Sequence, residues 1–152
     1  MSRTPSSAAA LLGVLILPLA ACSWDTEQKQ FDNYPSLAAS GLFSDPLMPA
    51  KLVPRSARAI AVGIVTDMKE TTLDFDFAPA DRVAVAGGFK PLSPAEQAQL
   101  REERWFTLRD PASALLKRCG AGQVEFLALG TGSHAHYQST PFPDMFGKFC
   151  HP

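Results

Sequence analysis

The order of apolar and polar residues predicts three strands in the middle of the chain. Residues 59–65 (A-I-A-V-G-I-V) form a short continuous apolar run, which is typical of a buried strand. Residues 72–77 (T-L-D-F-D-F) alternate strictly, so we expect a second strand with one apolar and one polar face. The polar residues 66–70 between them predict an antiparallel hairpin. Residues 82–86 (R-V-A-V-A) predict a third strand, which two glycines end.

Two helices and a fourth strand are expected to follow. Residues 93–104 begin with S-P-A-E, in which the serine can cap a helix, the proline can occupy its first position and the glutamate can complete a capping box. Residues 110–119 begin with D-P and precede a glycine, which predicts a second helix over 111–119. Residues 123–129 (Q-V-E-F-L-A-L) predict the last strand.

This order of elements predicts an α+β fold, because strands followed by helices are typical of an antiparallel sheet with helices on one side. We expect a small, mainly antiparallel sheet of about four strands, two helices packed on one face, and an irregular C-terminal tail. In that tail Phe142, Phe146 and Phe149 have the spacing of one helical face, which could close the core.

The beginning of the chain has the pattern of a signal peptide. Arg3 is the only charged residue before an apolar run from Ala8 to Leu19. A helix of that length would span roughly 18 Å, too short for a hydrocarbon core of about 30 Å. A positive start, a short apolar middle and small residues at the end are typical of a cleaved leader, so we expect residues 1–21 to be removed.

The residues at the expected cleavage site carry a family resemblance. Leu19-Ala20-Ala21-Cys22 resembles the lipobox of bacterial lipoprotein precursors. The resemblance implies that the Cys22 thiol is acylated, that the bond before it is cut, and that the mature protein is anchored in the cell envelope with its domain facing the periplasm. Ser23 then favours the outer over the inner membrane. An ordinary secretory signal cut near Ala21, with Cys22 in a disulfide, remains an alternative.

Residues 22–56 are interpreted as a lipidated N-terminus and a proline-rich tether. Several prolines interrupt this stretch and much of it is polar, which disfavours long regular elements. The apolar residues 42–48 leave two alternatives open, docking on the protein's own domain or recognition of a partner. Residues 57–152 are then expected to form a single α+β domain.

Charge and composition exclude some partners. The 152 residues carry a formal net charge of −1, with 46% hydrophobic and 19% charged residues. A nucleic-acid partner has no electrostatic support in this balance. The glycine-rich turns at 87–88 and 120–122 match no phosphate-binding pattern, and no cofactor is expected.

Cys119 and Cys150 are the two cysteines left once Cys22 carries lipid. An even pair in an exported domain predicts a disulfide. Two free thiols, or a role in metal binding or redox chemistry, are the alternatives.

His134 and His136 are the weak candidates for a metal or small-ligand site. In an extended chain the two side chains project to the same side, as paired ligands can, and Cys150 or His151 could supply a third donor. Asp74 and Asp76 also share a strand face, which usually indicates a hydrated surface.

The sequence therefore favours a membrane-anchored envelope lipoprotein with a non-catalytic accessory or interaction role. No catalytic constellation can be recognised, so an enzyme is not expected. The expected partners are the lipid bilayer, through acylated Cys22, and an envelope protein. The alternative is a metal- or small-ligand-binding lipoprotein that uses His134 and His136.

Overall fold

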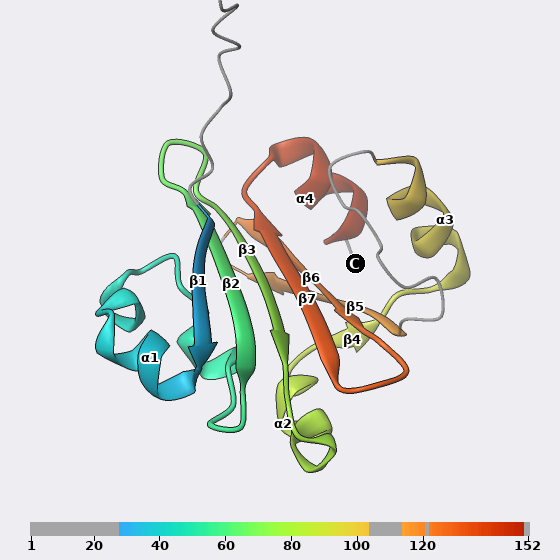
Figure 1. Cartoon of the computed structure of the whole chain (residues 1–152). Helices are drawn as coiled ribbons and strands as arrows, with labels where there is room; N and C mark the ends of the chain where they lie inside the picture. Colours follow the sequence, from blue (N-terminus) through green and yellow to red (C-terminus); the bar gives the residue numbers. More distant parts are fainter. Residues whose placement is uncertain (1–27, 104–113, 121, 151–152) are drawn as a thin grey trace, which may run out of the picture.

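The computed structural model describes residues 28–103, 114–120 and 122–150, and these form one sheet with short helices around it (Figure 1). The strands are β1 (Gln28–Asn33), β2 (Arg58–Val65), β3 (Glu70–Asp76), β4 (Lys90–Pro91), β5 (Ala114–Gly120), β6 (Gln123–Leu129) and β7 (His134–Thr140). The α-helices are α1 (Tyr34–Ala39), α2 (Arg82–Val85), α3 (Pro94–Glu102) and α4 (Pro143–Phe149), and the 3-10 helices are η1 (Leu42–Ser44), η2 (Ala50–Leu52) and η3 (Pro79–Asp81). In the described residues no helix has the length and apolar character needed to span a bilayer.

The seven strands are all antiparallel to their neighbours and lie in the order β1-β2-β3-β7-β6-β5-β4. β3 and β7 are far apart in the sequence and meet at the centre of the sheet, where Leu73 pairs with Tyr137. β6 extends the sheet on the other side of β7, where Leu127 pairs with the same tyrosine. Because side chains alternate along a strand, this register decides which residues share a face.

One face of the sheet carries the first core, which is closed by the segment between β1 and β2. Leu37 in α1 is fully buried there, and Leu52 in η2 is 6% exposed. The backbone N–H of Tyr34 donates to the carbonyl of Ala57 over 2.9 Å, which fastens the beginning of α1 to the chain before β2. The buried members are Leu37, Met48, Leu52, Val53, Ala57, Ile60, Val62, Leu73, Phe75, Phe77, Val85, Leu127, Leu129, Ala135 and Tyr137.

The opposite face carries the second core, beneath α3 and α4. Phe126 alternates with Leu127 along β6 and therefore points away from the first core. Its ring meets that of Phe149 edge to face, with the centroids 4.9 Å apart. The buried members are Leu92, Leu100, Leu115, Val124, Phe126, Ala128, Met145 and Phe149.

The predicted four-strand sheet with two packed helices is wrong, because the described residues form seven strands and four short α-helices.

The strand predicted at 82–86 is also wrong, because residues 82–85 form α2. In this helix Arg82 Nη1 donates to the carbonyls of Gly130 and Gly132 over 2.8 and 3.0 Å. These bonds hold a helical turn at the edge of the fold. Of its two valines, one is buried and Val83 is 85% exposed, so the apolar alternation does not reflect a strand.

The predicted helix 111–119 is also wrong over its described part, which forms β5. Residues 114–120 contain good helix formers, but they pair with β6 along their whole length and bury Leu115 in the second core. Helix propensity is a weak preference that such pairing overrides. The tail is not irregular either, because residues 143–149 form α4, in which Phe149 is buried while Phe142, just before the helix, is 41% exposed.

The tether predicted for residues 22–56 is wrong from Gln28 onwards. β1 pairs with β2, and the residues after it bury apolar side chains in the first core. The alternative in which residues 42–48 dock on their own domain describes this better, because Met48 is only 6% exposed. Prolines are compatible with this segment because it is built from short turns rather than long elements.

Three predicted elements are confirmed with small shifts at their ends. The hairpin predicted from 59–65 and 72–77 is β2 and β3, and the strand predicted at 123–129 is β6. The predicted capping box at the beginning of α3 is present: the Glu96 N–H donates to Ser93 Oγ over 3.3 Å, and the Ser93 N–H donates to the Glu96 carboxylate over 2.8 Å.

Candidate functional site

His134 and His136 lie on β7, and both project from the same face of the sheet, as the sequence predicts. The register places Asp76 of β3 opposite His134 and Asp74 opposite His136. Two histidines and two aspartates are therefore interleaved on one face. We call these four residues the histidine–aspartate cluster.

Hydrogen bonds join the four side chains of this cluster in two pairs. His134 Nδ1 lies 2.9 Å from Asp76 Oδ1, and His136 Nδ1 lies 2.9 Å from Asp74 Oδ1. His134 Nε2 also approaches Asp74 Oδ1, at 3.5 Å. The His134 side chain is 42% exposed, whereas that of His136 is 14% exposed. Each carboxylate therefore orients an imidazole ring, and only one of the two rings is well hydrated.

The structure does not supply the third metal donor, Cys150 or His151, that the sequence suggests beside His134 and His136. Cys150 is bonded to another sulfur, so it offers no thiolate ligand, and His151 lies outside the described residues. Across residues 28–103, 114–120 and 122–150, no three His, Cys, Asp or Glu side chains are grouped in a way that could hold a metal ion. The cluster itself is occupied by its own hydrogen bonds.

A second feature, which the sequence does not suggest, is a groove on the side of the first core. Its volume is about 540 Å³, within the range of ligand-binding clefts. One wall is the segment 46–52, which is mainly apolar and carries the exposed Lys51. The remaining lining comes from the turn before β4 and from three sheet strands, through Gly87, Arg118, Gln123, Glu125 and Tyr137.

Three polar side chains form a network at the floor of this groove. Arg118 of β5 and Glu125 of β6 are direct cross-strand partners. The guanidinium donates to the carboxylate through Nε and through Nη2, the latter over 2.8 Å, and Tyr137 Oη donates to the same carboxylate over 2.8 Å. The guanidinium also lies 4.4 Å from the ring centroid of Phe89, a cation–π contact.

The network fixes the charge of each of its members. Burial alone would raise the pKa of Glu125, but the hydrogen bonds from Arg118 and Tyr137 outweigh it and hold that pKa below its ordinary value. The bond to Glu125 raises the pKa of Arg118. Burial, with the neighbouring carboxylate of Glu125, raises the pKa of Tyr137 far above its ordinary value.

These directions suit binding better than proton transfer. A general acid or base works best with a pKa near the ambient pH, and every shift in this network moves the pKa away from neutrality. Lys51 and Arg118 contribute two cations to the groove and Glu125 contributes one anion. The groove can therefore hold a ligand with apolar surface and a negatively charged group.

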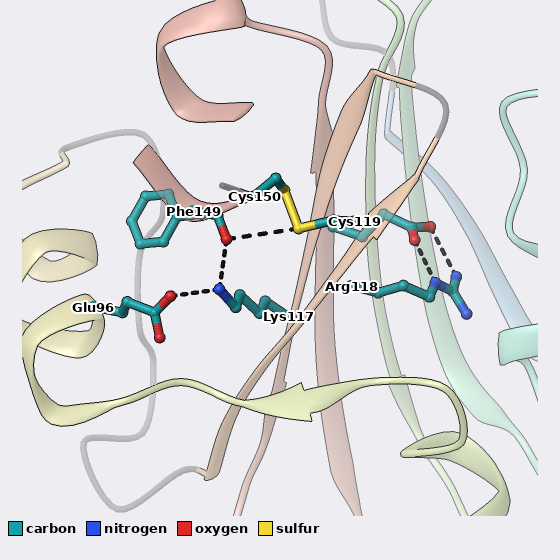
Figure 2. Close-up of a disulfide and its surroundings, with 7 residues drawn as sticks. Glu96, Lys117, Arg118, Cys119, Phe149 and Cys150 are labelled. Carbon is teal, nitrogen blue, oxygen red and sulfur yellow. Dashed lines mark hydrogen bonds and ion pairs between the residues drawn. A yellow bond between two sulfur atoms is a disulfide. The ribbon is translucent and has the colours of Figure 1, made fainter. Parts of the chain in front are cut away.

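Cys119 and Cys150 form the predicted disulfide, with their Cα atoms 5.7 Å apart (Figure 2). It joins the end of β5 to the residue that follows α4. Lys117 lies beside it and donates both to the Glu96 carboxylate and to the Phe149 carbonyl (Figure 2). The hydrogen bond from Lys117, together with that from the Ser93 backbone N–H, holds the pKa of Glu96 below its ordinary value. The ends of β5, α3 and α4 are thus fastened at one place.

The lipidation site predicted at Cys22 and the neighbouring Ser23 lie outside the described residues. The residues that sequence reasoning missed are Arg118, Glu125 and Tyr137. The predicted helix 111–119 would not place Arg118 opposite Glu125, whereas the strand β5 does. A signal was present: K-R-C-G followed by Q-V-E is the spacing of a tight hairpin with opposite charges across from each other.

Comparisons of this chain with protein-family models, with curated proteins and with solved structures gave no match.

Proposed function

We propose that the protein is a lipid-anchored bacterial envelope protein with a non-catalytic accessory role. Acylated Cys22 attaches it to a membrane, its domain faces the periplasm, and Ser23 favours the outer membrane over the inner. The observation that carries the proposal is Leu19-Ala20-Ala21-Cys22 at the end of a short apolar run. The disulfide between Cys119 and Cys150 supports it, because such bonds persist in oxidising compartments such as the periplasm.

Metabolic labelling with radioactive palmitate tests the anchor. We expect label in the wild-type protein and none in Cys22→Ser, because this thiol is the proposed site of thioether-linked lipid. The double variant Cys119→Ser/Cys150→Ser is the matched control, and it should keep its label. A wild-type protein without label, or label that persists in Cys22→Ser, would rule the anchor out.

We further propose that the accessory role is exerted through the groove. Its apolar wall, together with Lys51 and Arg118, fits an extended segment of an envelope protein that carries apolar side chains and a carboxylate. Arg118 is already oriented by Glu125 and Phe89, so little conformational freedom would be lost on binding.

Photo-crosslinking in whole cells tests the groove. A photoreactive amino acid at Ala50, on the groove wall, should give a defined adduct, whereas the same group at the exposed Ala95 of α3 on the other face should not. Arg118→Met should abolish the adduct at position 50. Adducts that are equal at the two positions, or that survive Arg118→Met, would contradict this use of the groove.

A second candidate function is binding of a metal or small ligand at His134 and His136, whose side chains project from the same face of β7. It ranks second because a ligand would have to replace the hydrogen bonds within the histidine–aspartate cluster. Titration with Zn²⁺ would support it if the wild-type protein bound tightly and His134→Ala/His136→Ala did not. Identical weak binding by both proteins would eliminate it.

A further inference from the structure

Two large apolar side chains are well exposed in the described part of the chain, and they lie at opposite ends of the sheet. Val83 is 85% exposed and lies in α2, which follows the end of β3. Phe142 is 41% exposed and lies between the end of β7 and α4. Figure 1 shows α2 and α4 at opposite ends of the molecule.

Phe142 shares its end of the sheet with the point where the chain enters the fold. Gln28, the first residue of β1, pairs with Gly63 near the end of β2, and the turn 66–69 follows directly. Thr71, just after that turn, pairs with Ser139 near the end of β7. We call this region, made of the beginning of β1, the turn 66–69 and Phe142, the anchor end (Figure 1).

The anchor end cannot lie far from the lipid-bearing residue. Five residues separate Cys22 from Gln28. Because an extended chain spans at most about 3.6 Å per residue, Gln28 lies within about 22 Å of the Cys22 Cα. Most of the residues that a tether over 22–56 would place between the domain and the membrane are instead folded against β2 and the first core.

Phe142 is held in place rather than carried on a loose loop. Pro141 and Pro143 flank it and restrict the backbone on both sides. Its N–H donates to Thr140 Oγ1 over 3.4 Å, and Thr140 Oγ1 lies 3.2 Å from the Glu70 carboxylate, at the beginning of β3. Its carbonyl accepts the Phe146 N–H over 2.9 Å. A bound surface would therefore meet an already ordered ring.

We propose that the anchor end rests on the bilayer and that Phe142 enters the lipid–water interface. This rests on the proposed acylation of Cys22, which confines the domain to the membrane surface. Phenylalanine is among the apolar side chains that membrane-surface segments bury at the boundary between headgroups and acyl chains. The exposed charged residues near Phe142 include both acids and a base, namely Asp67, Asp144 and Lys69. Such a mixture does not attract anionic lipid headgroups, so the proposed contact depends on the apolar ring of Phe142.

The test compares Phe142 with Val83 in the intact acylated protein. Phe142→Cys and Val83→Cys each add one free thiol, since Cys22 is acylated and Cys119 is bonded to Cys150. Each variant is labelled with a fluorophore and reconstituted into vesicles of phosphatidylethanolamine and phosphatidylglycerol that contain lipids with a nitroxide in the acyl chain. We expect severalfold stronger quenching at position 142 than at position 83.

The outcomes separate this inference from the proposal on which it rests. A protein that is acylated and bound to vesicles, but quenched equally at both positions or more strongly at 83, would overturn only the inference. A protein without acyl chains on Cys22 would overturn the anchor and this contact together. Circular dichroism of the two variants should match the wild type, because both side chains lie outside the two cores.

Discussion

The two faces of the sheet are closed by different means. On the first core, α1 and the residues up to β2 are fastened by buried side chains and by hydrogen bonds, such as that from Thr71 Oγ1 to the Leu47 carbonyl over 3.0 Å. On the second core, α4 also buries Met145 and Phe149, but the disulfide and Lys117 hold it in addition (Figure 2). Helices of six or seven residues are not stable alone, so both segments depend on these fastenings.

Because they are held in different ways, the two cores should respond to different treatments. A covalent link depends on the redox state of the compartment, whereas burial does not. The second core should therefore weaken under reducing conditions while the first core keeps its strength. Two variants separate the two contributions, and a third concerns the groove floor.

The largest effect is expected from the second core. Removal of the disulfide by Cys119→Ala/Cys150→Ala should lower the free energy of unfolding by about 4 kcal/mol, as estimated from the loop that the link closes. Hydrogen exchange should show that α4 and β5 lose protection before β2 and β3. Reducing agent should act on the wild-type protein and not on the variant. Uniform loss of protection across the sheet would contradict the distinction between the cores.

A somewhat smaller effect is expected from the first core. Leu37→Ala removes a fully buried side chain from α1 and should cost about 3 kcal/mol in denaturant unfolding. The exposed Ala38→Ser in the same helix is the control and should change stability by less than about 0.5 kcal/mol. The loss should be the same with and without reducing agent. If residues 28–56 were a tether, Leu37→Ala would have no effect.

The smallest of the three effects concerns the groove floor. Glu125→Gln should cost about 1–2 kcal/mol at neutral pH, because it weakens the bonds from Arg118 and Tyr137. Folding lowers the pKa of Glu125, so its contribution is present above the unfolded pKa of about 4.3 and is lost as the pH falls through the lower folded value. Unfolding curves at several pH values should show the gap between variant and wild type closing in acid. A gap that widens in acid would contradict this sign.

Local patterns in the sequence predict some elements of the fold well. The apolar run and the strict alternation predict the hairpin of β2 and β3, and the capping box predicts the beginning of α3. Cysteine parity predicts the disulfide. Each of these signals arises within a few residues or from the chemistry of one residue type.

The elements that were missed depend on contacts between distant parts of the chain. β5 contains helix formers and becomes a strand through pairing with β6, and only this pairing brings Arg118 opposite Glu125. β7 is rich in polar residues, yet it lies at the centre of the sheet because β3 offers complementary aspartates. The polar, proline-containing segment 28–56 has the composition of a tether. Its fold depends on a few apolar side chains, such as Leu37, that are buried against distant strands, and composition alone does not predict that burial.

The central claim is that Cys22 attaches this domain to a membrane, and mass spectrometry of the protein extracted from bacterial envelopes tests it most directly. The account predicts an N-terminal peptide that begins at Cys22 and carries acyl chains, together with Cys119 and Cys150 linked to each other. A peptide that still contains the leader, or one that begins at Cys22 without any acyl chain, would contradict it.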